Sequence, residues 1–140
     1  MDNFAQNAPD EVMAETMPDA PQRLAVGTFR DADAAHRGEG EASIYALADG
    51  SLIARFEDFR VTNGPALVVL LAKAESPRTA AAVINGGYVS LGELKGNVGS
   101  QNYALPQDID LSDYGSIVVW CELFDVLFSA ADLAAVNQGT

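Results

Sequence analysis

The residues best suited to chemistry in this sequence are its single cysteine and its single histidine, Cys121 and His36. A thiolate is a nucleophile and a soft metal ligand, and an imidazole beside it can accept a proton or act as a second ligand. A lone cysteine excludes an intrachain disulfide, a CxxC redox pair and a cysteine-rich zinc site. The chain therefore offers a redox-reactive thiol, a Cys–His pair, or a sparse metal site completed by carboxylates.

Cys121 lies in an apolar stretch over residues 115–128, whose β-branched residues are typical of a buried strand. Strand alternation predicts that Cys121 shares a face with Val119 and Leu123, while Glu122 points to the other side. An inert thiol in the core is the simpler interpretation of that setting. Trp120 is the adjacent candidate for cofactor contact, with aromatic core packing as the alternative.

The polar loop around His36 contains carboxylates that could complete a metal site. Asp31 and Asp33 are candidate ligands together with His36 and Cys121, and with Glu39 they could instead bind a hard cation such as calcium. The later residues do not have EF-hand spacing. A solvated acidic loop with an exposed histidine is therefore the competing interpretation.

Turn signals separate short strand-like segments along most of the chain. Asp49-Gly50 predicts a hairpin, Asn63-Gly64-Pro65 a sharp turn, and Leu67 to Ala72 a fully buried strand. We expect an all-β fold, an antiparallel β-sandwich or barrel of about seven or more short strands with one or two short helical turns. The expected strands cover 24–29, 42–47, 52–59, 67–72, 88–94, 101–105 and 117–121, with alternation over 124–128 and helical turns at 79–84 and 129–136.

The N-terminal segment differs in composition from the remainder of the chain. We expect residues 1–22 to be an acidic, proline-containing arm or linker, and residues 23–136 to be one β domain. Asp10 could cap a short helix that ends before Pro18.

The net charge of the chain argues against some classes of partner. The formal net charge of -12 over 140 residues repels nucleic acid and anionic membranes, so neither is an expected partner. No stretch approaches the roughly 20 apolar residues of a membrane span, so membrane insertion is not expected. The N-terminus lacks the basic and apolar regions of a signal peptide. These features leave a cytoplasmic setting open.

Several segments, in order and spacing, resemble the DM13 domain family. The resemblance runs from about Leu24 to Leu133, and its most specific parts are the 94–103 segment and the Trp120-Cys121 pair. The segments are Val26-Gly-Thr-Phe29, His36-Arg-Gly38, Phe59 before Asn63-Gly-Pro65, Leu91-Gly-Glu-Leu-Lys-Gly-Asn-Val-Gly-Ser-Gln-Asn-Tyr103, Val118-Val-Trp-Cys121 and Phe124-Asp-Val-Leu-Phe-Ser-Ala-Ala-Asp-Leu133.

This resemblance implies a periplasmic or secreted β domain with a proposed electron-transfer role. In such domains, often found beside haem- or sugar-binding DOMON domains, the cysteine is the proposed redox or cofactor-contacting residue, here Cys121. No DOMON-like segment accompanies it in this sequence, so the resemblance implies a separate redox or protein partner and not a stand-alone enzyme. A haem or a metal is the implied cofactor class, and a cofactor-free thiol is equally open.

Two functional hypotheses follow. The first is a redox domain acting through Cys121, with His36 as its helper. The second is a non-catalytic binding or adhesion module in which Cys121 is core packing and the acidic loops recognise the partner.

Overall fold

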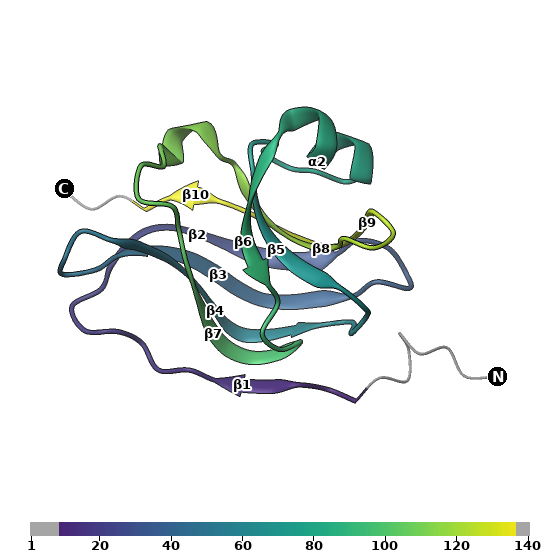
Figure 1. Cartoon of the computed structure of the whole chain (residues 1–140), viewed down its shortest axis with the longest axis horizontal. Helices are drawn as coiled ribbons and strands as arrows, with labels where there is room; N and C mark the ends of the chain where they lie inside the picture. The colour runs from purple at the N-terminus through teal and green to yellow at the C-terminus, as the bar shows by residue number, and fades with distance from the viewer. Residues whose placement is uncertain (1–8, 137–140) are drawn as a thin grey trace.

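The computed structural model describes residues 9–136, and its ten strands form one curled sheet (Figure 1). The sheet order is β1-β7-β4-β3-β2-β9-β8-β5-β6, with β10 beside β2. Every described pairing is antiparallel except the parallel pair β1–β7. The expected all-β class is therefore confirmed. The elements are β1 (Val12–Ala14), β2 (Gln22–Asp31), β3 (Gly38–Ala46), β4 (Leu52–Val61), β5 (Leu67–Ala72), α2 (Ala80–Gly86), β6 (Tyr88–Glu93), β7 (Val98–Ala104), η1 (Leu111–Asp113), β8 (Ser116–Cys121), β9 (Val126–Asp132) and β10 (Ala134–Ala135).

The long strand β2 connects the two halves of the curled sheet. Its first part pairs with β3 and β10, and its last residues, Phe29 to Asp31, pair with β9. The main core is therefore enclosed between β2, β3, β4 and β7 on one side and β5, β8 and β9 on the other. Phe29 lies at its centre, with its ring centroid 4.9 Å from those of both Phe56 and Phe59.

A smaller core packs between the outer face of β8 and helix α2. Val118 and Trp120 of β8 belong to it, together with Val83, the buried residue of the helix. The Thr79 hydroxyl accepts a hydrogen bond from the Ala82 amide at 3.1 Å and caps the helix. Gly87, with φ +92°, ends it. Among residues 9–136, no helix has the combined length and apolar character needed to cross a membrane.

Two expected helical segments are strands instead. The segment that Asp10 was expected to cap contains β1, which pairs with β7 through Val12 to Ala14. The alanine-rich segment 129–136 belongs to β9 and β10, where Ala130 and Ala131 are buried. Tertiary pairing overrides the helix propensity of alanine there, because β9 pairs with both β2 and β8, and β10 pairs with β2.

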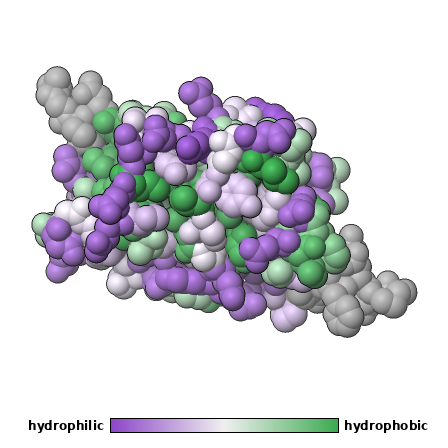
Figure 2. Space-filling model, turned by 45° about the horizontal axis from the view of Figure 1, so that its top comes forward, coloured by the Kyte–Doolittle hydropathy of each residue, from purple (hydrophilic) through white to green (hydrophobic). Residues whose placement is uncertain are grey.

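The expected alternation over 124–128 also fails at its start. Leu123 and Phe124 lie in the turn between β8 and β9 and are 62% and 66% exposed. Leu123 therefore does not share the core face of Cys121. Elsewhere, hydrophobic and hydrophilic residues are interspersed over the face shown in Figure 2.

Candidate functional site

Cys121 is the last residue of β8 and points into the main core. It is 1% exposed and belongs to the same cluster as Ile117, Val119 and Phe128. In the sheet it pairs with Leu67 of β5 and Val126 of β9. The thiol is therefore held at the end of the core, where β8 gives way to a turn.

One short loop covers the sulfur. The Cys121 thiol donates a hydrogen bond to the Pro65 carbonyl oxygen at 3.2 Å, and the Glu122 amide donates to the Ala66 carbonyl oxygen at 3.0 Å. Ala66 has φ +54°, a left-handed conformation that is strained for a residue with a side chain. The turn predicted at Asn63-Gly64-Pro65 is thus the cover of the Cys121 side chain.

A cleft lies on the outer side of this loop. It has a volume of about 280 Å³ and is lined by Gly64, Ala66, Leu67 and Glu122, among others. Three of these residues bracket Pro65, and Glu122 follows Cys121 directly in the chain. The cleft is therefore lined by chain neighbours of Pro65 and Cys121, but Cys121 itself does not line it.

His36 lies on the same end of the molecule but makes different contacts. Its Nδ1 atom lies 2.8 Å from Asp33 Oδ1, and its ring centroid is 4.5 Å from that of Phe128. Phe128 belongs to the same buried cluster as Cys121. The Phe128 ring therefore contacts His36 and belongs to the core that holds the thiol. Within residues 9–136, no hydrogen bond joins His36 to Cys121.

Trp120 and Cys121 point to opposite faces of β8. Trp120 is 2% exposed and packs in the smaller core with Val68 and Leu127. This placement follows directly from strand alternation. The tryptophan and the thiol thus occupy separate environments.

The carboxylates of the His36 loop mainly organise the loop itself. Asp33 Oδ1 accepts hydrogen bonds from the Ala35 and His36 amides at 2.9 and 2.8 Å. Asp31 accepts one from the Gly38 amide at 2.9 Å and pairs with Arg37 at 3.3 Å. Across residues 9–136, no three His, Cys, Asp or Glu side chains are grouped so that they could hold a metal ion.

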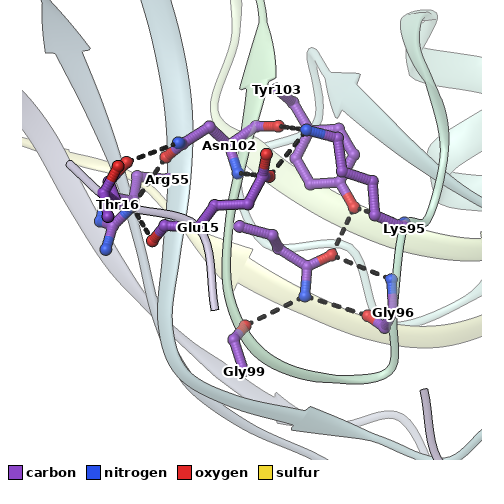
Figure 3. Close-up of polar contacts among 9 residues, drawn as sticks. Glu15, Thr16, Arg55, Lys95, Gly96, Gly99, Asn102 and Tyr103 are labelled. Carbon is purple, nitrogen blue, oxygen red and sulfur yellow. Dashed lines mark hydrogen bonds and ion pairs between the residues drawn. The ribbon is translucent and has the colours of Figure 1, made fainter. Parts of the chain in front are cut away.

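A second set of polar residues, which the sequence pattern does not reveal, binds the N-terminal arm. The buried Asn97 side chain donates to Asp10 Oδ1 and to the Val61 carbonyl oxygen, both at 3.0 Å, and accepts from the Glu11 amide at 2.8 Å. On the other side of β1, Glu15 pairs with Lys95 at 2.7 Å (Figure 3). A sequence feature that could have indicated these arm contacts is Lys95-Gly-Asn97, but by itself this pattern is typical of an ordinary turn.

A fully buried amide holds the loop that carries these residues. Gln101 Nε2 donates to the carbonyl oxygens of Gly96 and Gly99 at 3.0 Å each, and its Oε1 accepts from the Tyr103 hydroxyl at 2.5 Å. The same hydroxyl accepts from the Lys95 amide at 2.8 Å. Burial raises the pKa of Tyr103 well above its ordinary value, so this hydroxyl keeps its proton.

The fold and these contacts define a small all-β domain with one buried thiol beneath a loop and a polar seat for an N-terminal strand. The family model described as "Electron transfer DM13" matches residues 28–133. The chain belongs to this family. The resemblance expected from the sequence is thereby confirmed.

The solved structures that are similar share the fold. Two variants of Candida albicans superoxide dismutase 5 align with TM-scores of 0.56, at 14% and 13% identity, over 84% and 85% of this chain and 94% and 96% of theirs. Its Cu(II) form aligns at 15% identity with a TM-score of 0.54, over 84% of this chain and 95% of that one. No curated protein matches the sequence.

Proposed function

We propose that this chain is an electron-transfer domain in which Cys121 is the redox-reactive group. Membership of the electron-transfer DM13 family supports a redox-related role. The observation that carries the assignment to Cys121 is the 3.2 Å contact between its sulfur and the Pro65 carbonyl oxygen. Residues on both sides of Pro65 line the adjoining cleft, and the proposal is that local opening of this loop exposes the sulfur.

The proposed step is thiol–disulfide exchange with a partner protein. The Cys121 thiolate attacks one sulfur of the partner's disulfide, the partner's S–S bond breaks, and a mixed disulfide forms. The released partner thiolate takes the proton that Cys121 gave up. Because the chain has one cysteine, Cys121 is released when a second partner that carries two thiols attacks the mixed disulfide; those two thiols become a disulfide, and the first partner keeps both of its thiols.

His36 is the proposed helper, as a positioning residue. Its hydrogen bond to Asp33 fixes the imidazole ring, and its packing on Phe128 places that ring against the end of the core. Proton acceptance from a thiol exposed by loop opening is the role that this placement supports.

The donor set does not fit a copper or haem centre. One of the similar structures is a Cu(II) form, but this chain has one histidine in all, and its described residues lack a three-ligand group. The cleft beside the thiol has a volume of only about 280 Å³ and is partly lined by Glu11, Glu93 and Glu122. That size is at the lower end of pockets for drug-sized ligands, which favours a cofactor-free thiol over haem.

The partner is proposed to be a separate protein outside the cytoplasm. The exposed Leu123 and Phe124 in the turn directly after Cys121 provide an apolar contact for it. The family resemblance is the support for a periplasmic or secreted location.

The experiment is incubation of the native protein with oxidised glutathione, followed by intact mass measurement, beside a Cys121→Ala variant. We expect one glutathione adduct on the native protein and none on the variant. The adduct should form faster in mild urea, which favours local opening. A native protein that stays unmodified for days, while the unfolded chain reacts within minutes, would refute the redox assignment.

The second candidate function is a binding module with a structural cysteine. The 1% exposure of Cys121 within an apolar cluster favours it. In that case Cys121→Ala costs about 1–2 kcal/mol of stability through the cavity it leaves and changes no other property. The glutathione experiment therefore separates the two candidates.

A further inference from the structure

Strand β1 is attached to the domain in a different way from every other described strand. It forms the parallel pair with β7, in the register Val12↔Val98, Met13↔Gly99 and Ala14↔Ser100, and lies along the sheet edge (Figure 1). It adds nothing to the core, since Val12 is 70% exposed and neither buried cluster includes a residue before Ala25. Main-chain pairing with β7 and hydrogen bonds of polar side chains therefore hold β1 in place.

Two carboxylates anchor β1, one on each side of the paired triplet. Asp10 accepts hydrogen bonds from Asn97 and Arg60, both at 3.0 Å. Glu15 accepts from Lys95 Nζ at 2.7 Å and from the Asn102 amide at 2.9 Å, as Figure 3 shows. The pKa values of Asp10 and Glu15 are lowered, by the hydrogen bonds from Asn97 and Lys95 first of all. The β7 edge thus recognises an extended segment with acidic residues five positions apart.

The acceptor surface has room for an incoming backbone. A Cβ atom added at Gly96 would lie 2.5 Å from the Glu11 carbonyl oxygen, and one added at Gly99 would lie 2.0 Å from that of Met13. Both glycines fall within the family match at 28–133, whereas β1 lies outside it. The acceptor strand therefore lies within the region that matches the family, and the donor strand lies before that region.

The connection between β1 and β2 is strained. Ala20 has φ +53°, although it carries a side chain, and it lies between Pro18 and Pro21. Opening this hinge removes the strain and frees β1. A strained hinge next to a terminal strand favours exchange of that strand between identical chains, because the same contacts form in either arrangement.

We propose that the β7 edge is a strand-binding site whose partner is residues 10–16 of a second copy of this chain. Each copy donates β1 to β7 of the other copy. Asp10 of one copy then contacts Arg60 and Asn97 of the other, and Glu15 contacts Lys95. In the monomer, residues 10–16 of the same chain occupy this site. In the dimer, residues 10–16 of the second copy replace them. Glu11, Gly96 and Asn97 also line the cleft beside the thiol loop, but none of the arm contacts involves Cys121, so strand exchange does not depend on the chemistry of the thiol.

Strand complementation between two full-length variants tests the proposal. Asp10→Ala/Glu15→Ala removes the anchors of the arm and keeps the acceptor. Gly96→Ala blocks the acceptor and keeps the arm. We expect each variant alone to be monomeric, and an equimolar mixture to form a 1:1 complex at least tenfold tighter than either self-association, measured by native mass spectrometry and sedimentation equilibrium.

The matched control combines all three substitutions in one chain and mixes it with the Asp10→Ala/Glu15→Ala variant. No functional arm is then present, and no complex is expected. A complex of equal strength in this control, or a first mixture that stays monomeric, would overturn the proposal. Should Gly96→Ala fail to fold, as judged by its thermal melt, Arg60→Ala/Lys95→Ala replaces it as the acceptor-deficient chain.

Discussion

The thiol of Cys121 donates its hydrogen bond to the carbonyl oxygen of Pro65, at a distance of 3.2 Å. The sulfur is therefore hydrogen-bonded to the main chain of a loop whose residues on both sides of Pro65 line a cleft. We therefore expect access to the thiol to depend on the conformation of residues 63–66. On that proposal, the reactivity of Cys121 measures how often the loop opens.

Gly64→Ala should make the thiol more accessible. An added Cβ would lie 2.8 Å from Phe128 Cζ, so either the ring or the loop must move. We expect a loss of about 1–3 kcal/mol in the free energy of unfolding. Alkylation of native Cys121 should become about tenfold faster, if about 1.4 kcal/mol of that loss falls on loop opening.

The matched control is Gly86→Ala, at the end of helix α2, where the added Cβ meets its nearest neighbour at an ordinary 3.4 Å. Iodoacetamide labelling followed by mass spectrometry gives the rates. An unchanged rate in Gly64→Ala with a reduced stability would show that the loop does not control access to the sulfur.

Gln101→Leu should destabilise the domain more than its size suggests. The substitution leaves the buried carbonyl groups of Gly96 and Gly99 and the Tyr103 hydroxyl without their Gln101 partner. Unpaired buried polar groups cost about 1–3 kcal/mol each, and partial relaxation leads us to expect about 2–4 kcal/mol in total. Urea unfolding measures it.

Two companion variants calibrate that result. Tyr103→Phe removes one hydroxyl from the same network, and we expect about 1 kcal/mol. Gln107→Leu makes the same chemical change at an exposed turn position and should stay within about 0.5 kcal/mol. A Gln101→Leu loss no larger than that of Gln107→Leu would show that the buried amide is not needed.

The sequence predicts the β elements well where side-chain pattern alone decides the structure. The apolar run Leu67 to Ala72 is a strand over the predicted residues, and the Asp49-Gly50 turn joins β3 to β4. Partner-dependent segments were less predictable. Residues 129–132 and 134–135 are strand because β2 and β8 provide neighbours, and β1 is strand because it pairs with the edge of β7.

The sequence likewise predicted only part of the surroundings of Cys121, because some of its contacts depend on distant segments. Burial of Cys121 was expected from its apolar, β-branched stretch, and the structure has it, whereas the placement of Trp120 in a separate core was not predicted. Pro65 and Cys121 are far apart in the chain, and so are His36 and Phe128, so the sequence pattern alone does not reveal either contact. The same holds for the arm contacts, since Asp10 and Asn97 are 87 residues apart.

Arm docking should weaken in acid. The pKa values of Asp10 and Glu15 are lowered from 3.8 and 4.5 in the folded protein, by Asn97 and Lys95 first. A depressed carboxyl pKa gives stability that is fully present above the unfolded value and is lost as the pH falls through the folded value. The contribution is therefore complete at neutral pH and declines below about 4.5.

Amide NMR spectra between pH 7 and pH 3 measure this effect. Signals of residues 12–14 should move to free-peptide positions at lower pH, while those of β8 stay unchanged. In Asp10→Asn/Glu15→Gln the neutral amides do not titrate, so the arm signals should lose this pH dependence. Identical titration of the arm in both proteins would mean that these carboxylates do not anchor it.

Ala20→Gly should favour the closed monomer over the strand-exchanged dimer. Glycine adopts the observed φ of +53° without strain, so about 1 kcal/mol of hinge strain is removed from the closed form. Because each exchanged dimer opens two hinges, removing about 1 kcal/mol from each should lower the dimerisation constant of the otherwise unaltered chain about 30-fold. Sedimentation equilibrium at matched concentrations measures it, and Ala34→Gly, at an exposed loop position without positive φ, is the control. Equal dimer fractions in the unaltered chain, Ala20→Gly and Ala34→Gly would show that the hinge at Ala20 stores no strain that exchange releases.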